Sequence, residues 1–279
     1  MTKRSFAGRR KASVICLLLL SLDGVRLCMG EPPPAAAAAF ESYSKAVESR
    51  LVLQHRSPNS FLALDPQRAE QQGAEQRLRQ GEPLIDRVTE PATSSTGVGF
   101  AGALLHHWRG TAFAHGAKAA DLERLLRDFN SYPRYFSPQV VQAKVLSQSG
   151  DRMQVSMRVR QRHVITVVMD SAYDVNFGQL DMRHRYSISH STRISEIESP
   201  GTSGERVLSA SEEHGFLWRQ NTYWSYEERD GGLYLQIESV SLTRSIPAGL
   251  GWAIRPYVES IPRESLEFTL RSACNALRK

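Results

Sequence analysis

His190 is the residue of this chain whose type and setting come closest to acid–base chemistry. It shares strand parity with Tyr186 and Ile188, which places an imidazole on an apolar face. A histidine in such a place can orient a polar ligand group or transfer a proton near neutral pH. The same pattern also fits a histidine that is satisfied by a neighbouring hydroxyl or backbone group. His190 is therefore a candidate catalytic residue, and the sequence places no acid–base constellation around it.

The adjacent pair His106 and His107 invites a metal-site interpretation. Neighbouring residues of a strand point to opposite faces, so this pair cannot chelate one metal ion. The chain after residue 30 contains no HExxH, paired CxxC, GxSxG or phosphate-cradling glycine loop. We predict neither a metal site nor a cofactor.

Large aromatic rings suggest a different kind of site. In the segment TYWSYEERDGGLYLQIESVSL, the DGG triplet predicts a tight hairpin turn because it tolerates positive φ. Phe216, Trp218, Trp224 and Tyr226 share one parity on the incoming strand. Rings on one sheet face either fill a core or line a pocket for an apolar ligand.

Charge is concentrated at the start of the chain. The 279 residues carry a formal net charge of +6, from 35 basic and 29 acidic residues, but residues 1–30 hold six of those basic residues and only one acid. Without them the charge is close to neutral, so we predict no nucleic-acid partner. Arg158, Arg160 and Arg162 form a basic row on the outer face of one strand, typical of a wet face or a partner for acids and occasionally of an anionic-lipid contact.

The first 30 residues predict an export signal. A cationic start precedes an apolar run, residues 12–22, that is too short to span a bilayer. An uncleaved membrane-tethering helix is the alternative. Cys16 and Cys28 lie in this segment, so cleavage after Gly30 would leave only Cys274 and no intramolecular disulfide. We expect an exported protein, periplasmic or secreted.

The elements that position these residues fall into two parts. Residues 31–80 predict a helical or linker extension, with a helix over residues 35–56 and a polar stretch over 67–80 whose composition fits an exposed helix. Residues 81–279 predict a domain: a strand, a loop, a second strand, a helix near residues 118–129, a run of alternating strands, and a final helix. Pro262 suits the first turn of that helix, after a break at Pro256.

The order of strand, helix pair, six antiparallel strands and long C-terminal helix resembles the START-like helix-grip superfamily, also called SRPBCC, from about Ala103 to Leu277. The segments SLTRSIPAGLGW and PRESLEFTL are also similar to a group of uncharacterised exported bacterial proteins. The resemblance implies an α+β fold in which a curved antiparallel sheet wraps around the C-terminal helix. It also implies a cavity between them for an apolar or amphipathic ligand. The strand before Ala103 and the helix before Arg56 lie outside the common pattern.

On this basis we expect a protein that binds a hydrophobic small molecule or lipid, with peripheral membrane contact possible. The alternatives are a cyclase- or hydrolase-type enzyme that uses His190 in the same cavity, and a partner-binding envelope module that uses the extension and the arginine row. The predicted cavity residues are Tyr173, Tyr186, His190, Phe216, Trp218, Trp224, Tyr226, Trp252, Leu266 and Leu270.

Overall fold

A computed structural model describes residues 30–63, 73–88, 100–162, 166–246 and 251–278 of the chain. In the last range, side chains are described from residue 260 onward. The predicted export signal, most of the loop before Ala103 and the side chain of Trp252 therefore lie outside the described residues.

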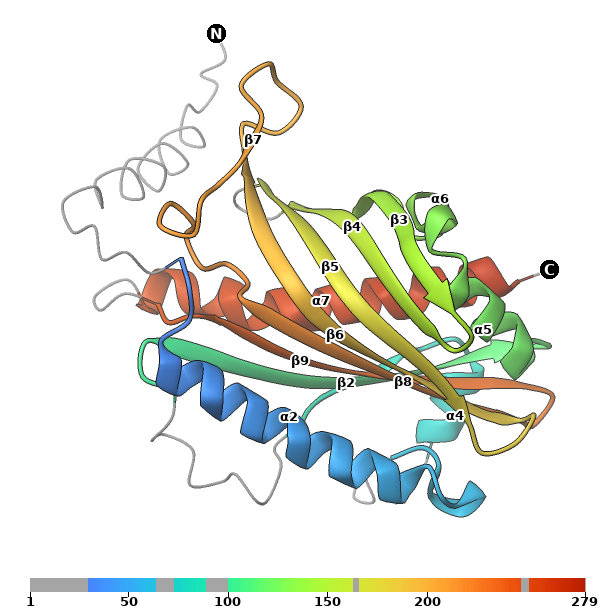
Figure 1. The fold of residues 1–279 in the computed structure, drawn as a ribbon. Coiled ribbons are helices and arrows are strands. Elements are labelled where there is room, and N and C mark those ends of the chain that lie inside the picture. Colours follow the sequence, from blue (N-terminus) through green and yellow to red (C-terminus); the bar gives the residue numbers. More distant parts are fainter. Residues whose placement is uncertain (1–29, 64–72, 89–99, 163–165, 247–250, 279) are drawn as a thin grey trace, which may run out of the picture.

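A single curved antiparallel sheet organises the chain (Figure 1), with the strand order β1-β2-β9-β8-β6-β5-β4-β3 and the short β7 paired with β6. The strands are β1 Leu84–Arg87, β2 Ala103–His115, β3 Val140–Ser149, β4 Arg152–Arg162, β5 Thr166–Gln179, β6 His184–Glu198, β7 Arg206–Val207, β8 Arg219–Arg229 and β9 Gly232–Arg244.

Helices lie on both faces of this sheet. They are α2 Pro34–Gln54, η2 Pro58–Ser60, α4 Ala74–Arg79, α5 Ala119–Arg127, η4 Phe129–Ser131, α6 Tyr132–Tyr135 and α7 Gly251–Leu277. Helix α7 crosses one face, which we call the concave face, together with α5 and α6, whereas α2 and α4 lie on the other, the convex face (Figure 1).

The concave face holds the main core. The predicted apolar stripe of α7 is confirmed, since Leu266, Leu270, Ala273 and Leu277 are all buried there. The predicted start of that helix is wrong, because α7 begins at Gly251 and runs through both prolines. Each proline removes one hydrogen bond from the helix, a loss that the packing of α7 on the sheet compensates.

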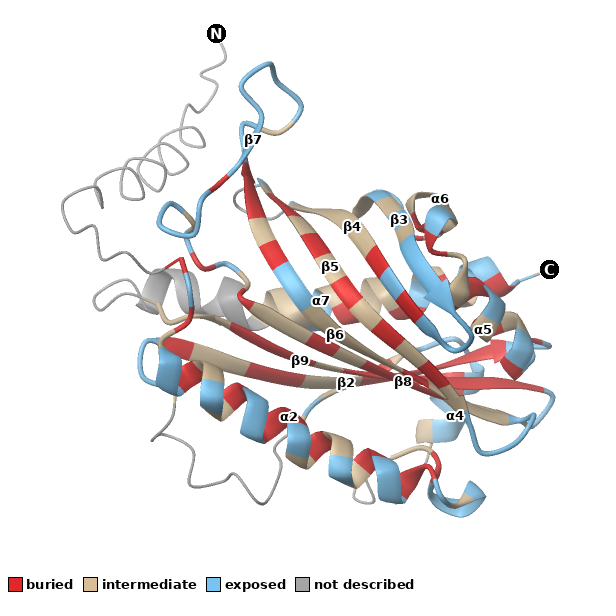
Figure 2. Cartoon of the chain, viewed as in Figure 1, coloured by how far each residue is buried: buried red, intermediate tan, exposed pale blue. Residues whose placement is uncertain are grey.

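Helix α2 is part of the fold and not a free extension. Its buried side chains Phe40, Tyr43, Val47 and Leu51 pack against the convex face in a second core. Buried and exposed residues alternate along the helix as one apolar stripe (Figure 2). Each large apolar side chain buried in this way contributes about 1.5–3 kcal/mol to folding.

The closing hairpin is confirmed. Asp230 and Gly231 form its two-residue turn with φ of 56° and 74°, and Arg229 pairs with Gly232 across it. Positive φ at both positions matches the twist of the two strands. With the curved antiparallel sheet and the long C-terminal helix, the predicted α+β helix-grip fold is confirmed.

We expect Phe40→Ala to lower the free energy of unfolding by about 3–5 kcal/mol, because it opens a cavity between α2 and the sheet. Val52→Ala is the matched control on the same helix, since Val52 is 50% exposed, and it should change stability by about 0.5 kcal/mol or less. Urea denaturation measures both. Equal, small effects would mean that α2 does not contribute to the folded core.

Candidate functional site

Two neighbouring cross-strand rows on the concave face consist mainly of polar side chains. Strand register sets them side by side, because residues directly opposite in an antiparallel pair point to the same face. The first row is Trp108, Ser239, Thr222 and Ser189; the second is His106, Ser241, Gln220, Ser191 and Tyr173. We call these nine residues the polar rows.

Several hydrogen bonds hold the second row in place. The Tyr173 hydroxyl donates to Gln220 Oε1 at 3.1 Å, and Gln220 Nε2 donates to Ser239 Oγ at 3.4 Å. The backbone N–H of Gln220 donates to Ser191 Oγ at 2.9 Å. Burial raises the pKa of Tyr173, so its phenol stays neutral. These bonds link Tyr173, Gln220, Ser191 and Ser239, and neither row contains Lys, Arg, Asp or Glu.

Parts of the polar rows remain accessible although the face belongs to the interior of the fold. Ser189, Ser191, Gln220, Thr222 and Ser239 are each only partly buried. The indole Nε1 of Trp108 is buried and has no hydrogen-bond partner among the described residues. Buried donors are normally paired, so this one lacks an acceptor.

An apolar surface adjoins the polar rows on the same face. The next rows towards the hairpin turn contain Trp224, Tyr226, Leu235 and Ile237, which belong to the concave core with Leu266 and Leu270 of α7. Helix and sheet approach closely here: a Cβ atom at Gly110 would lie 2.6 Å from Leu270 Cδ1. The concave face therefore changes from polar to apolar along its strands.

The structure brings together half of the predicted cavity residues. Tyr173, Trp224, Tyr226, Leu266 and Leu270 all lie in the concave core. Of the others, Phe216 lies in the segment before β8 and is 41% exposed, stacked on His214.

Tyr186 and His190 point away from α7, contrary to the expected orientation. Tyr186 stacks on His55 at 4.3 Å between ring centroids, and His190 contacts Glu48 of α2. The alternation predicted for this strand is real, but α2 makes the convex face apolar as well. In addition, a β-bulge between Ser191 and Arg193 changes the pairing register of β6 with β5. It shifts the side-chain alternation of β6 by one residue.

Trp218 was also expected to face α7, and it packs in the core beneath α2 instead. It precedes the first residue of β8, so the alternation of that strand does not extend to it. Its indole Nε1 is buried and has no partner in the described part of the chain.

His190 belongs to a small polar cluster on the convex side. Its Nε2 lies 2.8 Å from Glu48 Oε1, which also accepts a 2.9 Å hydrogen bond from the Tyr223 hydroxyl. The hydrogen bond to Glu48 raises the pKa of His190, and burial opposes this. The histidine is satisfied by a neighbouring carboxylate and lies on the sheet face opposite to α7.

A buried carboxylate joins α2 to the sheet. Glu238 is 1% exposed and pairs with Arg50 at 2.6 Å, with Arg109 at 2.9 Å and with His107 Nε2 at 3.0 Å. The Tyr43 hydroxyl lies 2.9 Å from His107 Nδ1. Burial raises the pKa of Glu238, but the hydrogen bond from His107 and the charges of Arg109 and Arg50 hold it well below its ordinary range.

The histidine pair and the cysteine do not form a reactive site. His106 pairs with Thr243 and His107 with Glu238, so they use opposite faces as expected. Within the described ranges, no group of three or more His, Cys, Asp or Glu side chains is placed to hold a metal ion. Burial raises the thiol pKa of Cys274 to about 11, which leaves it protonated at neutral pH.

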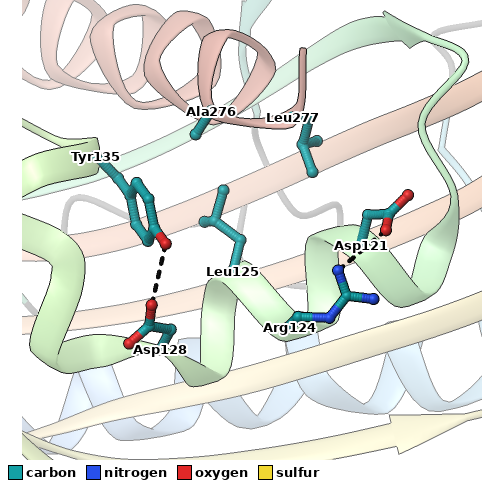
Figure 3. Close-up of a pocket in the computed structure, with 7 residues that line it drawn as sticks. All are labelled: Asp121, Arg124, Leu125, Asp128, Tyr135, Ala276 and Leu277. Carbon is teal, nitrogen blue, oxygen red and sulfur yellow. Dashed lines mark hydrogen bonds and ion pairs between the residues drawn. The ribbon is translucent and has the colours of Figure 1, made fainter. Parts of the chain in front are cut away.

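A small open pocket of about 180 Å³ lies at the C-terminal end of α7 (Figure 3). Its polar groups satisfy one another: Arg124 pairs with Asp121 at 3.1 Å, and Tyr135 donates to Asp128 at 3.0 Å. It is smaller than the roughly 300–1,000 Å³ of typical small-molecule sites. No helix in the described part of the chain is long and apolar enough to cross a bilayer.

Among known proteins, no family model and no curated sequence matches this chain. Several solved structures are similar to it at low sequence identity. They include the protein TTHA0849 from Thermus thermophilus, with 14% identity, a TM-score of 0.44, and 61% of this chain and 94% of that chain covered. The Zhui aromatase/cyclase from Streptomyces sp. R1128 has 13% identity, a TM-score of 0.42 and coverage of 62% and 93%.

A STAR-related lipid transfer protein fragment from Xanthomonas axonopodis has 16% identity, a TM-score of 0.41 and coverage of 68% and 98%. These neighbours thus include an aromatase/cyclase and a STAR-related lipid transfer protein. The likeness is one of fold.

The buried imidazole of His55 gives the fold a pH dependence. Burial lowers the pKa of His55 from 6.5 to about 4. The charge of Glu238 opposes this shift, and the charge of Arg50 adds to it. Between pH 4 and pH 6.5 the unfolded chain therefore binds more protons at His55 than the folded chain does. The contribution of His55 to the free energy of unfolding is fully present above pH 6.5 and is lost as the pH falls towards 4. We expect the titration of His55 to lower the free energy of unfolding by about 3 kcal/mol between pH 6.5 and pH 4.

His55→Gln can keep a hydrogen bond to Ser225, which lies 2.7 Å from His55 Nε2, but it cannot titrate. Urea denaturation at pH 7 and at pH 4.5 should show a smaller loss for this variant than for the wild type. An identical loss in both proteins would show that His55 is not the group responsible.

Proposed function

We propose that this protein binds a hydrophobic small molecule or lipid between the concave face of the sheet and α7. The observation that carries the proposal is the partly accessible pair of polar rows beside an apolar core on one face. Small-molecule sites combine such apolar walls with a few polar groups that fix orientation. The helix-grip fold is consistent with this kind of ligand.

We further propose that the chain is exported, and that it acts in the periplasm or outside the cell. The support is the cationic and apolar pattern of residues 1–30. Export would bring the protein into contact with envelope lipids as a source of ligand.

The two alternative functions receive less support. An enzyme that uses His190 needs that imidazole near the ligand, whereas its contacts are Glu48 and the ring of Tyr223 on the convex side. A partner-binding module needs the apolar face of α2 and the arginine row to be available. The helix face is buried against the sheet, and Arg158 pairs with Asp170 and Glu205.

Mass spectrometry of organic extracts from the full-length protein tests the proposal. We expect an apolar or amphipathic compound that co-purifies at a stoichiometry near one and is lost on denaturation. A protein that carries no such compound and takes up no neutral apolar dye such as Nile red would contradict the proposed function.

Filling the concave face should abolish binding. We expect Ser189→Phe to weaken Nile red binding by about tenfold or more, because the ring would occupy space beside Thr222 in the polar rows. Gln154→Phe is the matched control, since Gln154 is exposed on the outer side of β4 and bonds to Asp174. Fluorescence titration measures both. Equal weakening in the two variants would place dye binding elsewhere.

A further inference from the structure

The chemistry of the polar rows defines the kind of ligand they suit. Their side chains supply serine and threonine hydroxyls on β6, β8 and β9, with the amide of Gln220, the indole of Trp108, the imidazole of His106 and the phenol of Tyr173. The rows contain no Lys, Arg, Asp or Glu. A charged headgroup placed against them would lose its hydration without gaining an opposite charge, which is costly.

Formal charges at the two ends of this face are already compensated. Arg185, which pairs with Tyr226 in the apolar rows, forms a 2.7 Å ion pair with Glu123. Glu196, opposite Met169 at the other end, accepts hydrogen bonds from the backbone of His214 and Phe216. Neither group is available to neutralise a ligand charge.

The unpaired indole donor of Trp108 points to the same ligand chemistry. Trp108 begins the first polar row and packs against the concave core. Its buried Nε1 needs an acceptor, and an oxygen of a neutral hydroxyl, ester or ketone supplies one without bringing a charge into the interior. Next to it in the row, Ser239 and Thr222 can both donate and accept.

We propose that the ligand of this site is an uncharged amphiphile, an apolar molecule whose polar end is a neutral oxygen group, and that Trp108 and Thr222 hydrogen-bond that group. This specificity rests on the proposed binding function. It excludes ionised fatty acids and phosphate-bearing lipids as the preferred ligands.

Three probes with the same chain and different end groups test this specificity: oleyl alcohol, methyl oleate and oleate. Each is titrated below its aggregation concentration against full-length protein loaded with Nile red, at pH 8, where oleate is ionised and an ordinary imidazole is neutral. We expect oleyl alcohol and methyl oleate to displace the dye at concentrations about tenfold or more below that needed for oleate. Displacement by oleate at equal or lower concentration would overturn the proposal while leaving hydrophobic binding intact.

Two variants test the assigned residues. Trp108→Phe removes the N–H, and Thr222→Val removes the hydroxyl at nearly constant volume. Each should weaken oleyl alcohol binding by about three- to tenfold and leave the oleate affinity unchanged. Methyl oleate accepts hydrogen bonds only, so Trp108→Phe should weaken its binding as well.

Trp218→Phe is the matched control, because its buried indole Nε1 is equally unpaired within the described residues but lies beneath α2. It should bind all three probes as the wild type does. If the Trp108 N–H had only a structural role, Trp108→Phe would change thermal stability without changing the ratio of alcohol to oleate affinity, and that outcome would overturn the assignment. Failure of every probe and of Nile red to bind would contradict the proposed function itself.

Discussion

The buried carboxylate of Glu238 is the interaction on which the arrangement of layers depends. A charge that is removed from water must be compensated, and here the compensation comes from both sides of the contact, with Arg109 and His107 on the sheet and Arg50 on α2. Removing any partner would leave part of that charge unpaired in the interior. Together with the apolar stripe of α2, this requirement fixes the helix on the convex face. The convex side of β2, β9 and β8 is therefore covered by α2, whereas the polar rows lie on the concave side.

The concave face itself is divided by register. Because four strands align their residues directly, a change in residue type at the same level of each strand becomes a boundary across the sheet. Trp224 and Ile237 lie on the apolar side of that boundary, while Thr222 and Ser239 lie on the polar side. Helix α7 packs closely on the apolar side, because Gly110 lets Leu270 approach the sheet and the leucine side chains fill the contact. In the proposed function, this division would orient a bound amphiphile along the strands.

Sequence periodicity predicted the elements well and the faces poorly. The turn at Asp230, the helix around Leu122 and the stripe of α7 were each recoverable because local chemistry determines them. Alternation in β6 was correct only up to the bulge near Arg193, and a period of two does not say which layer covers which face. Tyr186 and His190 were assigned to the side of α7 because α2 was not expected to pack on the sheet. The bulge near Arg193 and the position of Trp218 outside β8 depend on tertiary register, which no local pattern encodes.

The polar rows escaped detection for a related physical reason. Ser187, Ser189 and Ser191 have the parity that a half-buried strand normally turns to water, so in sequence they are indistinguishable from a solvated face. They lie instead opposite Phe177, Val175 and Tyr173, inside the fold. Interior polar groups cost free energy unless they are hydrogen-bonded. Ser189, Thr222 and Ser239 are partly exposed, whereas the buried Nε1 of Trp108 has no partner within the described residues. This polar surface in the interior of the sheet, with the unpaired Trp108 donor among the described residues, is the observation from which we propose that an amphiphile binds there.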